Sequence, residues 1–275
     1  MTDAAAFAWA PAAARPLVAA AAAAAAADPR VVGLLATGSA ATGGMDEFSD
    51  VDVVIVCRDG DEAVLRRELG AFAAGLGPLL AGFTGEHVGE PGLLICLYGP
   101  PLVHVDLKVV DDAGLDTRTE DGAVLWQRDG ALDRALARAP AEWPAADPQW
   151  IEDRFWVWVH YAATKVGRGE LFECLDMLAF VRATVLGPLI AQARGRRAAG
   201  VRRLEQVAPD LVPALEATLG DHTAPGCTEA LRAAIALYRS LRDDGPAPTR
   251  RTAAERAAEG YLTEIEQRVR PVAGA

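Results

Sequence analysis

Three aspartates occupy positions from which they could act together on one charged group. Asp50 and Asp52 open an apolar, β-branched run that ends at residue 57, and Asp106 lies in a second run over residues 103–110. Because side chains alternate along a strand, Asp50 and Asp52 project from one face while the valines beside them enter the core. Asp106 shows the same outward alternation. If the two strands are neighbours, the three carboxylates converge.

Carboxylates brought together in this way require a cation. Two adjacent carboxylates repel each other strongly unless a positive charge lies between them. No histidine or thiolate cluster accompanies them, and a set of carboxylate oxygens suits hard ions such as Mg²⁺. Two such ions, ~3.5–4 Å apart, can activate an attacking oxygen and stabilise a leaving one. The three aspartates therefore predict a divalent metal site.

Gly38 and Ser39 follow an apolar run over residues 31–37, which predicts a buried strand that ends in a tight turn. A glycine at this place lets the backbone approach phosphate groups closely. The amides of the turn and the Ser39 hydroxyl can donate hydrogen bonds to β- and γ-phosphate oxygens. The turn lacks the Gly-Lys-Ser/Thr of a P-loop and the glycine spacing of a dinucleotide site.

Two further polar residues share the strand face of Asp106. His104 could assist an acceptor hydroxyl, and Lys108 could neutralise Asp106 or contact a phosphate. A purely structural role stays open for each of them.

The rest of the pattern predicts the elements that position these residues. Strands are expected over residues 31–37, 51–57, 79–83, 93–98 and 103–110, with helices over 11–27 and 61–76. Three prolines mark residues 136–148 as a linker. Five helical segments follow, over residues 150–166, 170–193, 209–219, 228–242 and 252–268, and predict a bundle. The expected domains are residues 1–140 and 148–275.

Composition narrows the class of protein. The net charge is −11, and residues 1–147 carry 10 basic and 22 acidic side chains, against 17 and 16 in residues 148–275. An acidic first part disfavours a nucleic-acid cleft there and suits divalent metals or a cationic acceptor, or it is simply a soluble surface. No apolar run suggests a membrane span, and the first basic residue, Arg15, comes too late for a signal peptide. We therefore expect a cytoplasmic protein.

The joint motif of Gly38-Ser39, ten intervening residues and Asp50-Val51-Asp52 resembles the DNA polymerase β-like nucleotidyltransferase superfamily. More narrowly, it looks like the small-molecule adenylyltransferases that inactivate aminoglycosides and lincosamides. The resemblance covers residues 31–110. It implies an α+β fold, with a small mixed β-sheet nucleotidyltransferase domain followed by an α-helical bundle, and two Mg²⁺ ions held by Asp50, Asp52 and Asp106.

One departure from this resemblance concerns the phosphates. Family members often carry arginines directly after the Gly-Ser, where this chain has Ala40, Ala41 and Thr42. Phosphate contacts are therefore expected from elsewhere in the chain.

The segment 160–170 resembles a lysine and Arg-Gly-Glu segment found in the helical domains of some such adenylyltransferases. There the lysine reaches the triphosphate, which implies that role for Lys165, with Arg168 as its helper. Lys165 is one of only two lysines beside 25 arginines, although it could equally be a surface lysine. Glu170 could be a general base, a substrate anchor, or the acidic first turn of the next helix.

These observations predict an enzyme that moves a nucleoside monophosphate from ATP, or another nucleoside triphosphate, to a hydroxyl group and releases pyrophosphate. The expected acceptor is a small hydroxylated molecule, with antibiotics of the aminoglycoside type as one class. There are two alternatives. The enzyme could transfer the nucleotide to a tRNA or a protein, or the chain could be an inactive relative that only binds nucleotides. The sequence is compatible with a monomer or a homodimer.

Overall fold

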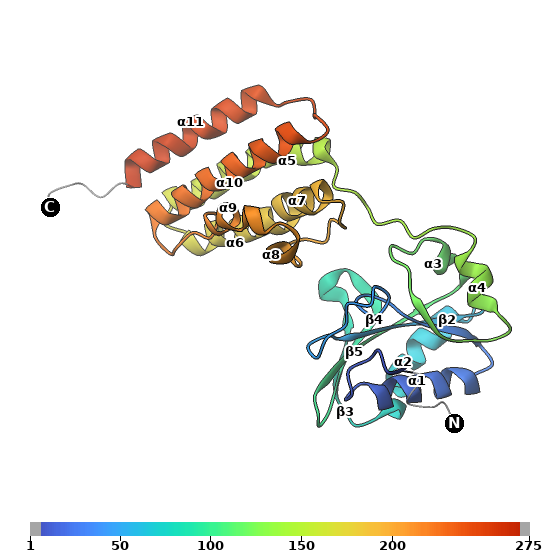
Figure 1. The fold of residues 1–275 in the computed structure, drawn as a ribbon. Coiled ribbons are helices and arrows are strands. Elements are labelled where there is room, and N and C mark those ends of the chain that lie inside the picture. Colours follow the sequence, from blue (N-terminus) through green and yellow to red (C-terminus); the bar gives the residue numbers. More distant parts are fainter. Residues whose placement is uncertain (1–6, 270–275) are drawn as a thin grey trace. The chain divides into compact units, whose positions relative to one another are not determined.

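The computed structural model describes residues 7–269, and the chain divides into two compact units between Trp143 and Pro144 (Figure 1). The N-terminal unit contains a six-stranded mixed sheet with helices, and the C-terminal unit is helical. The predicted α+β fold class is therefore confirmed.

One parallel pair lies near the centre of an otherwise antiparallel sheet. The strands are β1 (Val31–Ala36), β2 (Val51–Cys57), β3 (Leu79–Gly85), β4 (Glu90–Tyr98), β5 (Val103–Val110) and β6 (Ala123–Gln127). Their order is β3-β4-β5-β2-β1-β6, and only β2 and β5 run parallel among the described strands. Strands β2 and β5 have the predicted bounds, whereas β6 lies in a segment for which no element was predicted.

The two faces of the sheet are covered differently. Helices α1 (Arg15–Ala27) and α2 (Glu62–Leu76) pack on one face, where the larger apolar core of this unit lies. The short helices α3 (Asp112–Asp116) and α4 (Ala131–Leu136), neither of them predicted, contribute to a smaller core on the opposite face.

That second face is exposed near the edge strand β3, which is followed directly by the 3₁₀ turn η2 (Glu86–Val88). Phe83 pairs with Ile95, and Ile95 pairs with Asp106, so all three side chains lie on this face. The Phe83 side chain is 55% exposed. Polar groups on this part of the sheet are therefore accessible to a ligand.

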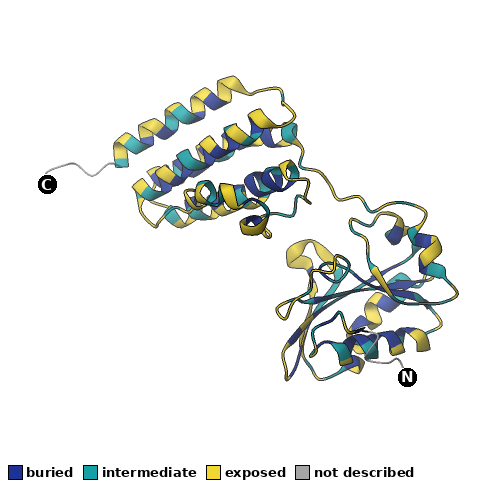
Figure 2. Ribbon diagram, in the orientation of Figure 1, coloured by how far each residue is buried: buried dark blue, intermediate teal, exposed yellow. Residues whose placement is uncertain are grey.

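The C-terminal unit consists of helices around one apolar core. They are α5 (Pro148–Gly167), α6 (Leu171–Val181), the π segment η3 (Arg182–Leu186), α7 (Gly187–Ala193), α8 (Leu204–Val207), the 3₁₀ turn η4 (Pro209–Leu211), α9 (Val212–Glu216), α10 (Ala224–Asp244) and α11 (Thr252–Val269). Figure 2 shows the long helices exposed along one side and buried along the other, as amphipathic helices of a bundle should be.

One expectation for this unit needs correction. The helix predicted over residues 209–219 is broken into η4 and α9, because prolines at 209 and 213 remove backbone donors. The stretch Leu171–Ala193 is also long and apolar enough to cross a membrane by length and composition, with a mean hydropathy of 1.7. Half of that window is buried in the unit, which is typical of a core helix.

A buried carboxylate links three helices of this unit. Glu152 on α5 is fully buried and accepts hydrogen bonds from Trp156 Nε1 (3.1 Å), Tyr238 Oη (2.6 Å) and the Arg251 amide (2.8 Å). Arg242 Nη1 lies 3.4 Å from its second oxygen. A buried charge is tolerable when it is paired and hydrogen-bonded in this way. Glu152 therefore fixes α10 and the start of α11 to α5.

We predict that Glu152→Ala destabilises the helical unit by about 3 kcal/mol, because the Trp156 indole and the Tyr238 hydroxyl lose their buried acceptor, while Arg242 keeps Glu255 as a buried partner. Urea unfolding of the full chain, followed by far-ultraviolet circular dichroism, measures the change. The neighbouring Asp153→Ala is the matched control: Asp153 forms a half-exposed pair with Arg251, so its loss should cost about 1 kcal/mol or less. Equal losses in the two variants would contradict a special role for Glu152.

The same carboxylate predicts an acid dependence. Burial alone would raise the pKa of Glu152, but its hydrogen bonds and the Arg242 charge outweigh burial and hold the pKa below 4.5. The folded unit then binds fewer protons than the unfolded chain, so this stability is present above pH 4.5 and is lost as pH falls through the lower folded-state pKa. In Glu152→Gln, the unfolding free energy should fall less steeply with acidification in this range. A slope identical to that of the wild type would refute this.

Candidate active site

The parallel pairing of β2 with β5 sets Asp52 beside Asp106. The two residues are direct partners in the register of these strands. Val51 and Val53 on β2 and Val105 on β5 are buried on the other face, against α1 and α2. Since residues in register on adjacent strands point the same way, both carboxylates lie on the open face.

Asp50 and His104 set the electrostatics around Asp106. Asp50 directly precedes β2, and its charge, together with burial as the larger cause, raises the pKa of the Asp106 carboxyl. His104 Nε2 lies 2.8 Å from Asp106 Oδ1 and opposes that shift through its charge and hydrogen bond. The site therefore contains three carboxylates, and one of them, Asp106, is influenced by both Asp50 and the His104 imidazole.

The Gly38 turn packs directly against these acids. The Thr37 amide donates to the Asp52 carbonyl oxygen at 3.0 Å, which holds the end of β1 against the start of β2. Gly38 adopts a φ of +62°, and a Cβ atom on it would overlap Asp52 Oδ2. Only glycine lets the turn approach the carboxylate so closely.

Ser39 follows with a buried hydroxyl. Its exposed fraction is 6%, and Ser39 Oγ has no hydrogen-bond partner within residues 7–269. Buried polar atoms are normally hydrogen-bonded, so an orphaned hydroxyl at a turn indicates a group that a ligand oxygen can satisfy. This is the role expected of Ser39 toward a phosphate.

Glu120 is a residue of this site that was not predicted. The Gly38 amide donates to Glu120 Oε1 at 3.2 Å. Glu120 reaches the turn because it precedes β6, which pairs with β1. The apolar run Ala123-Val124-Leu125-Trp126, directly after the turn residues Asp121-Gly122, could have indicated this edge strand.

The two polar neighbours of Asp106 differ in their partners. His104 contacts Asp106, as its shared strand face predicts. Lys108 Nζ instead donates to Glu90 Oε2 on β4 at 2.8 Å, so the ion pair expected between Lys108 and Asp106 is replaced by one with a neighbouring strand. Lys108 is thus held two positions along β5 from Asp106.

Part of the N-terminal unit matches a known protein family. Residues 22–80 match the nucleotidyltransferase domain family, a segment that includes Gly38, Ser39, Asp50 and Asp52. This segment is therefore similar to a nucleotidyltransferase domain of the DNA polymerase β-like type. Asp106 and Glu120 lie beyond the matched segment of that domain. No curated protein matches the chain.

Two solved structures resemble the whole chain distantly. An aminoglycoside 6-adenyltransferase from Bacillus subtilis shares 14% identity, over 88% of this chain and 94% of that one, with a TM-score of 0.39. A nucleotidyltransferase-like protein from Exiguobacterium sibiricum 255-15 shares 14% identity over 90% and 77%, with a TM-score of 0.38. TM-scores this low do not establish a shared arrangement of the whole chain.

The residues assigned to the helical unit form a cluster of their own. Lys165 Nζ donates to Glu170 Oε2 at 2.6 Å and lies 3.2 Å from Glu173 Oε2. The bond to Glu170 is the main reason why the pKa of Lys165 is raised. Arg168 is more exposed and lies 3.9 Å from Glu170. Glu170 therefore binds Lys165, and its side chain does not cap α6. The roles of these residues toward a nucleotide stay predictions.

The carboxylate oxygens of Asp50, Asp52 and Asp106 fit a hard metal ion only in part. Within residues 7–269, no group of three or more His, Cys, Asp or Glu side chains forms a metal site. Asp52 and Asp106 are adjacent and Asp50 is close enough to act on Asp106, yet the three carboxylates do not form a ready-made cage. Their assignment as metal ligands stays a prediction.

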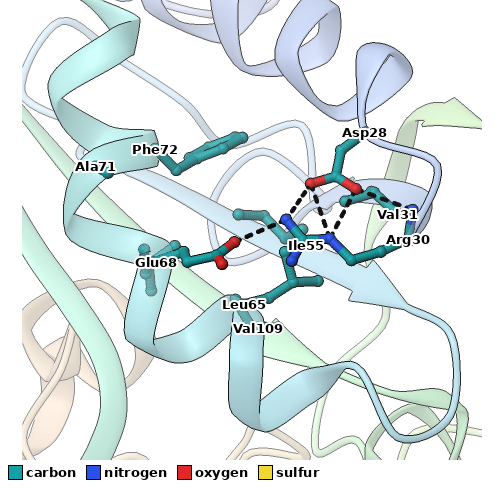
Figure 3. Close-up of a pocket in the computed structure, with 10 residues that line it drawn as sticks. Asp28, Arg30, Val31, Ile55, Leu65, Glu68, Ala71, Phe72 and Val109 are labelled. Atoms are coloured by element: carbon teal, nitrogen blue, oxygen red, sulfur yellow. Dashed lines mark hydrogen bonds and ion pairs between the residues drawn. The ribbon is translucent and has the colours of Figure 1, made fainter.

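The N-terminal unit also has a pocket on the opposite, helix-covered face of its sheet. Its volume is about 350 Å³, and its floor includes Ile55 and Phe72. Figure 3 shows the Arg30 guanidinium between Asp28 and Glu68, with nitrogen–oxygen distances of 2.6 and 2.7 Å. Since Arg30 already has two carboxylate partners, this pocket offers no unpaired charge to a nucleotide.

We predict that Gly38→Ala and Gly43→Ala each lose about 1 kcal/mol of stability, because both positions have positive φ. Only Gly38→Ala should displace the Asp52 carboxylate, since nothing lies within 4 Å of the corresponding methyl at Gly43. Thermal unfolding and crystal structures of the two variants measure these effects. An Asp52 side chain left in place in Gly38→Ala would contradict the packing described for the turn.

Proposed function

We propose that this chain transfers a nucleoside monophosphate from a nucleoside triphosphate, ATP in the first instance, to a hydroxyl of a small acceptor. The observation that carries this proposal is the in-register pair of Asp52 and Asp106 on an open sheet face, next to the Gly38 turn. The nucleotidyltransferase family match over residues 22–80 supports the reaction class.

The turn supplies the contacts to the phosphates. The Gly38 amide and the orphaned Ser39 Oγ are donors that suit phosphate oxygens. Binding of this kind fixes the α-phosphorus near the two aspartates and so contributes by positioning.

Asp50, Asp52 and Asp106 would hold Mg²⁺. The carboxylate oxygens suit this ion, which proteins usually bind through one or two carboxylates together with substrate phosphates and water. A complete cage of side chains is therefore not needed before the nucleotide binds. When bound, the ion supplies neutralisation of phosphate charge and lowers the barrier to displacement.

The acceptor hydroxyl lies next to Asp106 in this mechanism. Asp106 accepts its proton, and His104, 2.8 Å away, keeps the carboxylate oriented. The acceptor oxygen forms a bond to the α-phosphorus while the bond from that phosphorus to the bridging oxygen of the β-phosphate breaks. Pyrophosphate leaves, and the acceptor carries the nucleoside monophosphate.

A small hydroxylated, cationic molecule is the proposed acceptor, and we place the reaction in the cytoplasm. Residues 1–147 carry 22 acidic side chains against 10 basic ones, which favours cations and disfavours nucleic acid. Antibiotics of the aminoglycoside type combine hydroxyl groups with positive charge, so they are the first acceptors to test.

We predict that Asp52→Asn and Asp106→Asn each reduce nucleotidyl transfer at least about 100-fold, because each removes a carboxylate that would hold the cation on the reacting phosphates. Purified protein is incubated with each of four nucleoside triphosphates, Mg²⁺ and a panel of hydroxylated antibiotics. Pyrophosphate release and the mass gain of the acceptor are measured. Asp121→Asn is the matched control: Asp121 is exposed and pairs with Arg118, so its loss should leave the rate within about twofold.

Two outcomes would count against the proposal. Pyrophosphate release that is equal in the wild type and in Asp52→Asn would show that the measured rate does not come from this site. Mass gain on RNA or protein, with none on any small acceptor, would replace the proposed acceptor class and keep the reaction.

A further inference from the structure

The Gly38 amide, a donor assigned above to the triphosphate, already binds a carboxylate. Its N–H donates to Glu120 Oε1 at 3.2 Å. One amide hydrogen cannot serve a phosphate oxygen and Glu120 equally well. A triphosphate must therefore displace the Glu120 oxygen or bind beside its negative charge. This inference rests on the proposed nucleotide site.

The position of Glu120 is fixed by the backbone. Ala123, at the start of β6, pairs with Ala36 at the end of β1, so the segment before β6 lies alongside the segment after β1. Gly122 lies so close to β1 that an added Cβ would stand 3.0 Å from Leu35 Cβ and 3.2 Å from the Ala36 carbonyl oxygen. This close approach brings the carboxylate of Glu120 to the turn.

The charges around Gly38 are unusual for a phosphate-binding turn. Asp52 Oδ2 lies against its Cα, and Glu120 takes its amide, so two carboxylates contact the same glycine. The Ser39 hydroxyl beside them has no partner within the described residues. The turn thus offers the Ser39 hydroxyl to a phosphate oxygen, whereas its Gly38 amide is already bound by the Glu120 carboxylate.

We propose that Glu120 is a specificity-determining residue of the nucleotide site. It competes with phosphate oxygens for the Gly38 amide, and its charge repels a bare polyphosphate. A triphosphate whose charge is compensated by a divalent cation meets less of this repulsion. Glu120 thereby selects the cation-bound nucleotide over the free one.

Nucleotide affinity of the full chain tests this selection. Binding of ATP, GTP, CTP and UTP is measured by isothermal titration calorimetry, in Mg²⁺ and separately in EDTA, for the wild type and Glu120→Gln. In EDTA, Glu120→Gln should lower the Kd of the preferred nucleotide about tenfold, because a like charge beside the phosphates is gone. In Mg²⁺ the change should be about twofold. Urea unfolding verifies that the variant is folded.

Asp121→Asn is the matched control for general electrostatics. It removes one charge from the next residue, whose side chain is 73% exposed and pairs with Arg118 instead of Gly38. Its Kd in EDTA should change less than about twofold. An equal gain in Asp121→Asn would show that net charge, and not the contact with Gly38, sets the affinity.

Other outcomes separate this inference from the proposed function. Unchanged or weaker binding in Glu120→Gln, with a wild type that binds nucleotide, overturns the role of Glu120 alone. Absence of binding to all four nucleotides in Mg²⁺, in both proteins, overturns the nucleotide site and this inference with it. Tighter binding in EDTA confined to Glu120→Gln supports both.

Discussion

The parallel pairing of β2 with β5 is the constraint on which the site depends. Two strands that run in the same direction and share a register must place partner residues side by side on one face. Asp52 and Asp106 are such partners, so their proximity follows from backbone hydrogen bonds and needs no contact between the side chains. The mutual repulsion of the carboxylates is a cost that the buried valines on the other face of the same strands offset.

One buried polar residue from each unit illustrates two different situations. In the helical unit, Glu152 is fully buried and both of its oxygens have partners, so its charge adds rigidity. In the sheet unit, Ser39 Oγ is buried without a partner in the described chain, and Asp106 is held at a raised pKa, chiefly by burial. Satisfied polar groups are typical of structural positions, and unsatisfied ones of binding sites.

The strength of a sequence pattern decided what could be predicted. Alternating apolar residues gave β2 and β5 their bounds, and the same alternation placed Asp106 on the open face. The Gly-Ser turn and Asp52 were recognisable because their residue types and spacing are restrictive. Helices α3 and α4 and strand β6 are five or six residues long, too short for periodicity to reveal. Glu120 was missed with them, since its place at Gly38 depends on β6 pairing with β1.

Partners of charged side chains were the least predictable feature. Lys108 pairs with Glu90 because the register of β4 against β5 brings that carboxylate near, and no local pattern encodes this register. Lys165 was predicted as a phosphate-binding cation, but the turn into α6 places Glu170 and Glu173 around it.

The edge position of β6 has a consequence for how the domain folds. Ala36 at the end of β1 pairs with Ala123 at the start of β6, so one side of the Gly38 turn is closed by residues that lie far along the chain. Contacts of such long sequence separation form late and slow folding, because the loop entropy is lost before the strands gain their hydrogen bonds. An expressed fragment that stopped at residue 80, the end of the family match, would lack β5, β6 and Asp106. Because α4 contributes to the smaller core, a fragment designed to keep this unit intact should extend through α4.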